Sequence, residues 1–569
     1  MHIDIVPNRH SPPTVLLRES YREGARVRKR TLATLSALSP AQVEAMRRTL
    51  RGETLVPLAD LFAIVRSQHH GHVQAIRTAM TRLGFESLIA SRPSRERDRV
   101  VAMVMARILA PASKLATTRW WHTTTLPDAC GVTDADEEDL YAALDWLLTR
   151  QTHIEKKLAA RHLHKGGFVL YDLTSSYFEG TTCPLAARGY NRDGKSGKLQ
   201  VNYGLLTDSR GCPVAVSVFE GNTGDPKTLL PQVEKLQNTF AIDQLVLVGD
   251  RGMISQKQID ALKQREGIEW ITALRTGAIR KLVDSGQIQL GLFDERPLFE
   301  VTHPDFPGER LVACRNPQLA LLRAHKRQSL LDATARELEK VRGMIARGTI
   351  HGKDAIGVRV GKVVDKYKMA KHLVLDIRDD GFDFHLDDDK VAAEAALDGI
   401  YVIRTSVPAQ RLAADDVVRS YKMLSQVERA FRSLKTIDLQ VRPIRHRLED
   451  RVKAHIFLCM LAHYVAWHMM EAWRALLFSD EDQPAKTTRD PVAPAKRSTA
   501  ALAKVSAKVL DDGTPVHSFH TLLQDLSSIV SNTCRRHGAS PAGEPTFNLV
   551  TTPSPTQQRA YDLLKSIHV

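Results

Sequence analysis

The sequence predicts a multidomain α/β protein, and three observations lead to this prediction. The chain has 569 residues, which exceeds the size at which one hydrophobic core stops growing, so several domains are expected. Between residues 166 and 275, short apolar runs are separated by amphipathic helical stretches, as is typical of a mixed sheet flanked by helices. The formal net charge of +15 favours a polyanionic partner, either nucleic acid or a membrane surface.

The N-terminal part is basic and then helical. Residues 14–33 alternate around Arg22-Glu23-Gly24, which predicts a β-hairpin, and residues 1–34 contain seven Lys or Arg against three Asp or Glu. Residues 40–160 carry helical periodicity. We therefore expect a basic arm at 1–38 and a mainly helical DNA-binding region at 39–160; a solvated surface is the alternative. The cations of the arm are Arg26, Arg28, Lys29 and Arg30.

The next segment predicts a sheet of defined order. Three strands come first, then a helix, a strand, a helix and a strand, at 166–172, 199–208, 212–221, 225–240, 244–250, 254–264 and 270–275. The second and third strands flank the turn 209–211, which predicts a hairpin. The crossovers that follow place parallel strands beside the first strand, so we expect strands one and four to be neighbours.

The rest of the chain divides by composition. Residues 276–398 combine a long charged helix with a hairpin, "HLVLDIRDDGFDFHLD", and are interpreted as an insertion into the core at 161–275. The core resumes at 399–475. Residues 476–569 begin as a linker and end in a small helical segment. The uncharged stretch 454–470 contains three His residues, so we expect a buried helix and no membrane span.

The six cysteines are scattered without a C-x-x-C pair. This argues against a zinc ribbon or a disulfide framework and suits a reducing cytosol. The N-terminus lacks a basic stretch followed by a long apolar run, so no signal peptide is expected.

Three carboxylates occupy positions at which chemistry is expected. Asp172 and Asp250 each end a predicted strand, and Glu428 shares a helix face with the apolar Leu424 and Phe431. Converging buried carboxylates repel one another unless a divalent cation neutralises them, and oxygen ligands select Mg²⁺ or Mn²⁺. Two such ions about 3.5–4 Å apart would clamp a phosphodiester.

Structural alternatives stay open for each carboxylate. Asp172 could cap a turn and the other two could form ion pairs; the partners would be Thr174 or Ser175 for Asp172, Arg251 for Asp250 and Arg432 for Glu428. The stretch "GYNRDGKS", 189–196, matches the phosphate-loop pattern, but a strand and not a helix is expected after it. A nucleotide-binding function is therefore the last of the interpretations.

Several stretches together resemble the DDE transposases of bacterial insertion sequences. They are "YDLTSSYFEG", "GYNRDGKSGKLQVNYGLL", "GCPVAVSVFEGNTGDPKTL", "VLVGDRGMIS" and "YKMLSQVERAFRSLK". The last resembles the signature Tyr-x-x-Arg-x-x-x-Glu-x-x-x-x-x-x-Lys of one group. The resemblance spans about 160–470, and the basic hairpin is similar to that of one branch. It implies an RNase H-like core in which Asp172, Asp250 and Glu428 bind the metal ions.

The resemblance also implies residues near the bound DNA end. Tyr421 and Lys435 match the Tyr and Lys of the signature, whereas Leu424 stands at the Arg position, so Arg429 or Arg432 would have to compensate. In this group an insertion commonly separates the second Asp from the Glu, where 276–398 lies. Further phosphate contacts are expected from a basic run that follows the helix, comprising Arg442, Arg445, Arg447, Arg451 and Lys453.

The function that the resemblance implies is metal-dependent DNA cleavage and strand transfer. The partners would be transposon terminal inverted repeats and target DNA, with Mg²⁺ or Mn²⁺ as a two-ion cofactor and a homodimer or larger assembly on DNA. The protein would act in the bacterial cytoplasm at the nucleoid. The alternatives are an RNase H-fold nuclease that does not join DNA and a non-catalytic DNA-binding relic of a transposase.

Overall fold

The computed structural model describes residues 1–53, 55, 61–483, 488–536 and 545–568. The chain forms two compact units, and each is built from both ends of the sequence. The first comprises residues 1–68 and 530–551, and the second comprises 69–529 and 552–569. Part of the predicted linker, 484–487, lies outside the described residues.

The first unit contains two small antiparallel sheets and a helix. One sheet has the order β1-β2-β3 and the other β16-β15-β4. The elements are β1 (His2–Val6), β2 (Thr14–Glu23), β3 (Arg26–Thr34), α1 (Pro40–Leu50), β4 (Phe62–His69), β15 (Val530–Arg536) and β16 (Phe547–Val550). The predicted hairpin is confirmed as β2–β3, and its two-residue turn uses Gly24 at φ +65°. The expected helical region is interrupted by β4, a strand that the periodicity did not predict.

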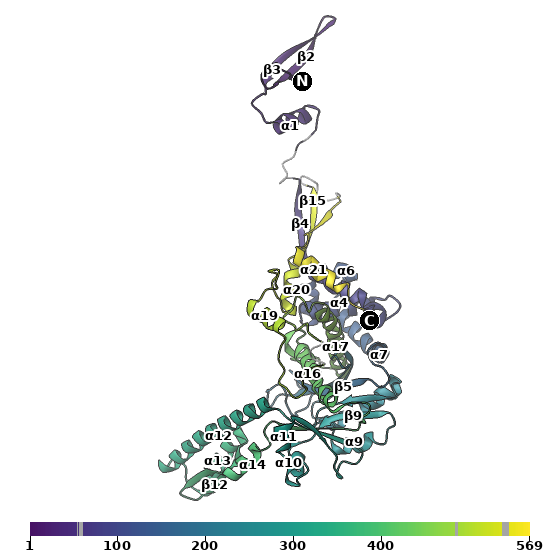
Figure 1. Cartoon of the computed structure of the whole chain (residues 1–569). Coiled ribbons are helices and arrows are strands. Elements are labelled where there is room, and N and C mark those ends of the chain that lie inside the picture. Colours follow the sequence, from purple (N-terminus) through teal and green to yellow (C-terminus); the bar gives the residue numbers. More distant parts are fainter. Residues whose placement is uncertain (54, 56–60, 484–487, 537–544, 569) are drawn as a thin grey trace. The chain divides into compact units, whose positions relative to one another are not determined.

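The second unit begins with helices that surround a buried core. They are α2 (Gly71–Arg82), α3 (Phe85–Ile89), α4 (Arg95–Leu109), α5 (Lys114–Trp120), α6 (Leu126–Cys130) and α7 (Glu137–His162). Helix α7 starts at a capping box, in which the Asp136 side chain accepts from the backbone N–H of Asp139 and the Asp139 side chain accepts in return. The buried helix predicted at 454–470 is confirmed as α17 (Glu449–Ala472), which packs against α4, α7 and β7 (Pro213–Glu220) (Figure 1).

Within the described residues, no single helix combines the length and apolarity needed to cross a membrane. One pair meets the length and composition criteria jointly, Arg95–Leu109 with Lys114–Thr123, and it is bent by 85°.

An eight-stranded mixed sheet forms the centre of the second unit. Its order is β10-β11-β14-β9-β8-β5-β6-β7. The remaining strands are β5 (Phe168–Tyr177), β6 (Gln200–Thr207), β8 (Leu245–Val248), β9 (Ile268–Ala273), β10 (Leu298–Val301), β11 (Arg310–Arg315) and β14 (Ile400–Thr405). Strands β5, β6 and β7 pair antiparallel, and β8 joins β5 in parallel, so the predicted neighbourhood of strands one and four is confirmed.

The helices that follow the sheet strands complete the unit. They are α8 (Asp225–Glu234), α9 (Gln256–Leu262), α10 (Thr276–Asp284), α11 (Leu292–Glu295), α12 (Pro317–Ala346), α13 (Lys353–Tyr367), α14 (Asp388–Ala395), α15 (Ala414–Lys422), α16 (Leu424–Arg432), α19 (Thr499–Ala507), α20 (Phe519–Ser527) and α21 (Pro555–Leu564). The single helix predicted at 421–435 is therefore α15 and α16 in succession, continued by a π-helical turn at Ser433–Ile437.

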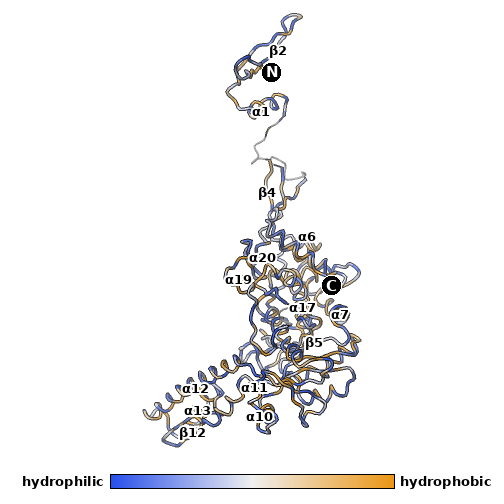
Figure 2. The backbone as a smooth tube through the Cα atoms, viewed as in Figure 1, coloured by the Kyte–Doolittle hydropathy of each residue, from blue (hydrophilic) through white to orange (hydrophobic). Residues whose placement is uncertain are grey.

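The segment 276–398 is not a body separate from the sheet. Its strands β10 and β11 extend the main sheet through β14, because β11 pairs antiparallel with β14. A smaller part has its own core, in which α12 and α13 pack with the hairpin of β12 (Leu373–Ile377) and β13 (Phe382–Leu386). Hydrophobic and hydrophilic residues are interspersed along α12 and α13, as expected for helices buried on one face (Figure 2).

The C-terminal residues contain helices, as predicted, and also two strands that the prediction did not include. Strands β15 and β16 belong to the first unit, whereas α20 and α21 pack against α2 in the second. Trp473, at the end of α17, donates its indole N–H to the carbonyl of Ala560 at 2.9 Å. The chain thus returns to its N-terminal elements in both units.

Candidate active site

The two aspartates lie at equivalent positions on neighbouring parallel strands. The β5–β8 pairing ends with Leu170 opposite Val248, so Asp172 and Asp250 each follow two residues beyond the last pair. Neighbouring strands lie about 4.8 Å apart, which brings the two carboxylates close together. The prediction that Asp172 ends its strand is wrong, because β5 continues to Tyr177 through its antiparallel pairing with β6.

Local backbone bonds orient both carboxylates. Asp172 Oδ1 accepts from the N–H of Leu173 at 2.8 Å. Asp250 Oδ1 accepts from the N–H groups of Gly252 and Met253 at 2.9 and 2.8 Å, which closes the turn after β8. Neither carboxylate uses the partner that the structural alternatives proposed for it.

Glu428 reaches the aspartates from helix α16, which packs against β5. Phe431 anchors the helix because its buried ring lies edge-on to Tyr203 of β6, with centroids 5.9 Å apart. The prediction that Glu428 is buried is wrong, since its side chain is exposed. The helix face that contains Phe431 is covered by the sheet, whereas Glu428 lies at the edge of this contact, open to solvent.

The charges of the three carboxylates act on one another. The pKa of Asp172 is raised to about 7, chiefly by burial and also by the neighbouring charges of Asp250 and Glu428, against the lowering effects of the Leu173 N–H and Arg192. Among the described residues, none of the three carboxylates has an ion-pair partner within 4.0 Å. An anionic group of oxygen ligands without a protein counter-ion fits a hard divalent cation.

Tyr421 lies beside the carboxylates. Burial raises the pKa of its hydroxyl to about 12, and Asp250 contributes next. Leu424 is half-buried and packs against the main core. Two basic residues of the same helix, Arg429 and Arg432, are exposed.

The loop 189–196 contributes residues that sequence reasoning missed. Arg192 donates to both carboxylate oxygens of Asp225 at 2.5 and 2.6 Å and is close enough to lower the pKa of Asp172. Strand β6 follows the loop, as predicted, and no helix begins there. The available signal was the adjacent Arg192 and Asp193 within "GYNRDGKS", a stretch that also matches the phosphate-loop pattern.

Asp193 of this loop is the centre of a buried charge network. Its side chain is 1% exposed and accepts from Lys435 Nζ at 2.7 Å and from the N–H of Tyr177 at 3.0 Å. Arg442 also pairs with it. These residues and Lys195 line a hollow of about 290 Å³. Lys435 is 8% exposed, and its ammonium group is already paired with Asp193.

The other predicted basic residues are not part of this cluster. Three of them, Arg445, Arg451 and Lys453, contact acidic side chains. Arg447 is exposed. Arg445 lies 3.3 Å from Glu179, and Arg451 lies 3.4 Å from Asp145 and over the ring of Tyr141. In the first unit Arg26, Arg28, Lys29 and Arg30 are all exposed on β3; the pairs there are Arg28 with Glu23, Lys29 with Asp4 and Arg30 with Glu19.

The raised pKa of Asp172 predicts a pH-dependent stability in the absence of metal ions. The folded pKa of about 7 exceeds the ordinary 3.8, so the folded state binds the proton more tightly and stability falls as pH rises from about 4 to 7. The full shift corresponds to about 4 kcal/mol, and since the side chain is partly exposed we expect about 2 kcal/mol. The side chain of Asp172→Asn stays neutral. As pH rises from 4 to 8, the free energy of unfolding of this variant should therefore increase by this amount relative to wild type, measured by urea unfolding in the presence of chelator.

A matched substitution separates this effect from general charge removal. Asp243→Asn removes an exposed carboxylate that lies 3.2 Å from Lys165. Its free energy of unfolding should depend on pH in the same way as that of wild type. The same pH dependence of the free energy of unfolding in Asp172→Asn and wild type would contradict the prediction.

Comparison with known proteins gives two matches to family models. One described as "Transposase DDE domain" matches residues 164–465, which is 302 of the 569 residues and includes Asp172, Asp250 and Glu428. One described as "IS1634 family transposase, N-terminal domain" matches residues 3–56. No curated protein matches the chain.

Six chains of solved structures also match. One is the cryo-EM structure of the piggyBac transposase synaptic complex with hairpin DNA, at 10% identity and a TM-score of 0.32, covering 80% of this chain and 77% of that one. The family rests on the match over more than half of the chain. The chain therefore belongs to the DDE transposase family: it is a transposase, an enzyme that acts on DNA, with a domain of the kind that uses divalent metal ions.

Proposed function

We propose that Asp172, Asp250 and Glu428 are the catalytic, metal-binding carboxylates with which this transposase cleaves transposon ends and joins them to target DNA. The observation that carries the proposal is the equivalent position of the two aspartates on β5 and β8, with Glu428 close enough to raise the pKa of Asp172. The matched family range contains all three residues.

The strand order supports an RNase H-like core. Three antiparallel strands, β7, β6 and β5, are followed across the sheet by the parallel strands β8 and β9. Strand β14 and then β11 and β10 extend the sheet beyond this core. The extension enters the chain between the second Asp and the Glu, so it lengthens the sheet without separating the strands that bear the aspartates.

The cofactor we propose is a pair of Mg²⁺ or Mn²⁺ ions. Two such ions about 3.5–4 Å apart would stabilise both the attacking and the leaving oxygen of a phosphodiester. When bound, such ions would neutralise the carboxylates and polarise the phosphodiester that is cleaved.

Residues around the carboxylates would position the DNA end. Tyr421 lies beside Asp250 with a protonated hydroxyl, which can donate a hydrogen bond to a phosphate oxygen. Arg192 lies near Asp172 and is held in place by its two bonds to Asp225. The orientation of its guanidinium is therefore fixed before DNA binds.

The exposed cations near the site are proposed as phosphate contacts. Arg429 and Arg432 on α16 and Arg445 and Arg447 after it are exposed. Replacing Arg445 and Arg447 together by Gln should lower the dependence of log affinity on log salt by about 0.9 for each lost contact on duplex DNA. The measurement is binding to terminal-repeat DNA between 50 and 200 mM salt; an unchanged slope would exclude both residues from the interface.

Assembly and domain roles follow from the same proposal. The basic arm 1–38 and the region 39–160 would bind the terminal inverted repeats, and residues 161–275 with 399–475 would carry the chemistry. Because two transposon ends are joined to one target, the active form would be a homodimer or a larger assembly on DNA. The protein would act in the bacterial cytoplasm at the nucleoid, where target DNA lies.

One experiment tests the proposed function directly. Purified protein is incubated with a duplex that carries the DNA flanking its own gene, together with supercoiled plasmid as target, in Mg²⁺, Mn²⁺ or EDTA. We expect end cleavage and joined products in either metal and none in EDTA. Cleavage without joining would make the protein a nuclease, and binding without cleavage would make it a DNA-binding relic; either result would overturn the proposal.

A further inference from the structure

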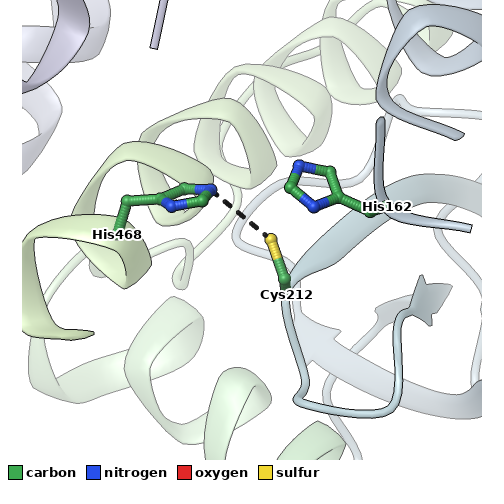
Figure 3. A group of neighbouring side chains, drawn as sticks. All are labelled: His162, Cys212 and His468. Carbon is green, nitrogen blue, oxygen red and sulfur yellow. Dashed lines mark hydrogen bonds between the residues drawn. The ribbon is translucent and has the colours of Figure 1, made fainter. Parts of the chain in front are cut away.

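Three metal-ligand side chains meet in the second unit, away from the three carboxylates. They are His162, Cys212 and His468, and one ligand atom from each lies within 4.8 Å of the other two. All three side chains are buried, and Figure 3 shows them pointing toward one another. They come from separate elements, since His162 ends α7, Cys212 precedes β7 and His468 lies near the end of α17.

The two imidazoles are oriented as metal ligands are. His468 Nε2 lies 3.8 Å from Cys212 Sγ. His162 Nε2 lies 3.1 Å from the buried hydroxyl of Tyr464, which leaves Nδ1 of His162 as the nitrogen available to a ligand shared with the other two (Figure 3). A bond from the second ring nitrogen to a fixed polar group is the usual way in which proteins set the tautomer of a metal-bound histidine.

The thiol is held in place by its turn. Gly211 has φ +85° in the turn between β6 and β7, and Asp208 Oδ1 accepts from the N–H groups of Arg210 and Cys212, both at 2.9 Å. Asp208 also accepts from Arg210 Nε at 3.0 Å, so its charge is paired. These bonds fix the backbone that carries Cys212 without occupying its sulfur.

The separations suit a tetrahedral zinc ion. Bond lengths of about 2.3 Å to sulfur and 2.0–2.1 Å to nitrogen place the two atoms about 3.6 Å apart in a tetrahedral site. The observed 3.8 Å between His468 Nε2 and Cys212 Sγ is close to this value.

A hollow adjoins the two histidines. It has a volume of about 440 Å³ and is lined by both histidines together with Arg210, Trp467, Glu471 and His568. Water can occupy it, and it gives an ion a route to the ligands. The family range 164–465 includes Cys212 but neither His162 nor His468, so the family match does not cover the three ligands together.

We propose that His162 Nδ1, Cys212 Sγ and His468 Nε2 bind a Zn²⁺ ion, with water from the adjoining hollow as the fourth ligand. The ion would tie the end of α7 and the β6–β7 turn to α17. The thiol loses its proton on binding, so the ion and thiolate together add one positive charge to a site where Asp208 is paired with Arg210. The proposal does not depend on the assignment of the catalytic carboxylates.

Cobalt substitution of the full chain tests the proposal. Purified protein is stripped with chelator, shown to be folded by circular dichroism, and titrated with Co²⁺. Thiolate-to-cobalt charge transfer absorbs strongly, whereas carboxylate-bound Co²⁺ has no such band, so the readout excludes the catalytic carboxylates. We expect the band to saturate at one Co²⁺ per chain and to disappear when Zn²⁺ displaces Co²⁺. Absence of the band in the folded wild-type protein would overturn the proposal.

Two variants locate the site. Cys212→Ser should abolish the band, and His468→Gln should weaken Co²⁺ binding at least about a hundredfold, in line with the loss of a ligand or its support. Cys459→Ser is the matched control, because Cys459 is also buried near a histidine, His455, at 3.9 Å, but the positive charges of Arg107 and Lys114 lie beside it. A band that persists in Cys212→Ser, or one that is lost in Cys459→Ser alone, would contradict the assignment.

The wild-type protein provides a second readout that needs no variant. A ligand that binds only the folded state raises the melting temperature with its concentration. Zn²⁺ should therefore raise the melting temperature of the stripped protein, and Mg²⁺ at equal concentration should not reproduce this shift because it does not bind thiolate and imidazole well. Equal shifts with both ions would assign the effect to the carboxylates and overturn the zinc site.

Discussion

Replacing Asp250 by Asn should reduce DNA cleavage and joining by about a thousandfold, which corresponds to about 4 kcal/mol of lost transition-state stabilisation. The substitution retains the size of the side chain and the acceptor oxygen for the N–H groups of Gly252 and Met253, so the turn after β8 should persist. It removes one negative charge from the three carboxylates. The measurement is the rate of end cleavage on a labelled duplex in Mg²⁺ or Mn²⁺.

The control for this variant is another Asp→Asn change in the same unit. Asp243 precedes β8, its side chain is exposed, and it lies 3.2 Å from Lys165. It is therefore at the opposite end of β8 from Asp250. Asp243→Asn should cleave at the wild-type rate, and Asp250→Asn should bind terminal-repeat DNA as well as wild type or better. Cleavage by Asp250→Asn within about tenfold of wild type would remove Asp250 from the catalytic set.

Replacing Asp193 by Ala should destabilise the protein by about 3 kcal/mol. Asp193 is 1% exposed and pairs with both Lys435 and Arg442, so its removal leaves two cations in a largely buried place. Breaking a buried pair from one side costs about 3–5 kcal/mol because the remaining charge is uncompensated. The lower end of this range applies here, since the Arg442 side chain is 22% exposed and can turn toward solvent. Urea unfolding measures the effect.

A double variant distinguishes the charge effect from a packing defect. If the cost arises from uncompensated charge, Asp193→Ala with Lys435→Ala should be more stable than Asp193→Ala alone, by about 1–2 kcal/mol. If the cost arises from lost packing, the second substitution should add to it. A single variant that costs less than about 1 kcal/mol would show that the network contributes little to the fold.

The order of the core strands could be predicted because apolar residues recur at every position of short buried strands. Strand β8 is uninterrupted Leu-Val-Leu-Val and ends at Val248, two residues before the predicted end at Asp250. The length of β5 could not be predicted in this way, because its second half is polar. Ser176 is nevertheless buried and lies 3.0 Å from the hydroxyl of Tyr203, and Ser175 accepts from the N–H of Arg192. A strand whose polar groups are satisfied internally has no hydropathy signal.

The candidate site was predicted from the same strand ends and from one helix face, and its remaining parts depend on distant contacts. Periodicity placed Glu428 on the face of Phe431, but exposure is decided by how far the sheet extends beneath the helix. The pairing of Asp193 with Lys435 joins residues 242 positions apart, and no local pattern predicts it. The same holds for His162, Cys212 and His468, whose spacing resembles no zinc motif.

The discontinuity of both units has a consequence for synthesis of the protein on the ribosome. The first unit needs strands β15 and β16, and the second needs α20 and α21, all of which follow residue 518. A nascent chain therefore contains every proposed catalytic carboxylate well before either unit is complete. A chain released before residue 519 would therefore carry the proposed carboxylates without the closing strands and helices of either unit.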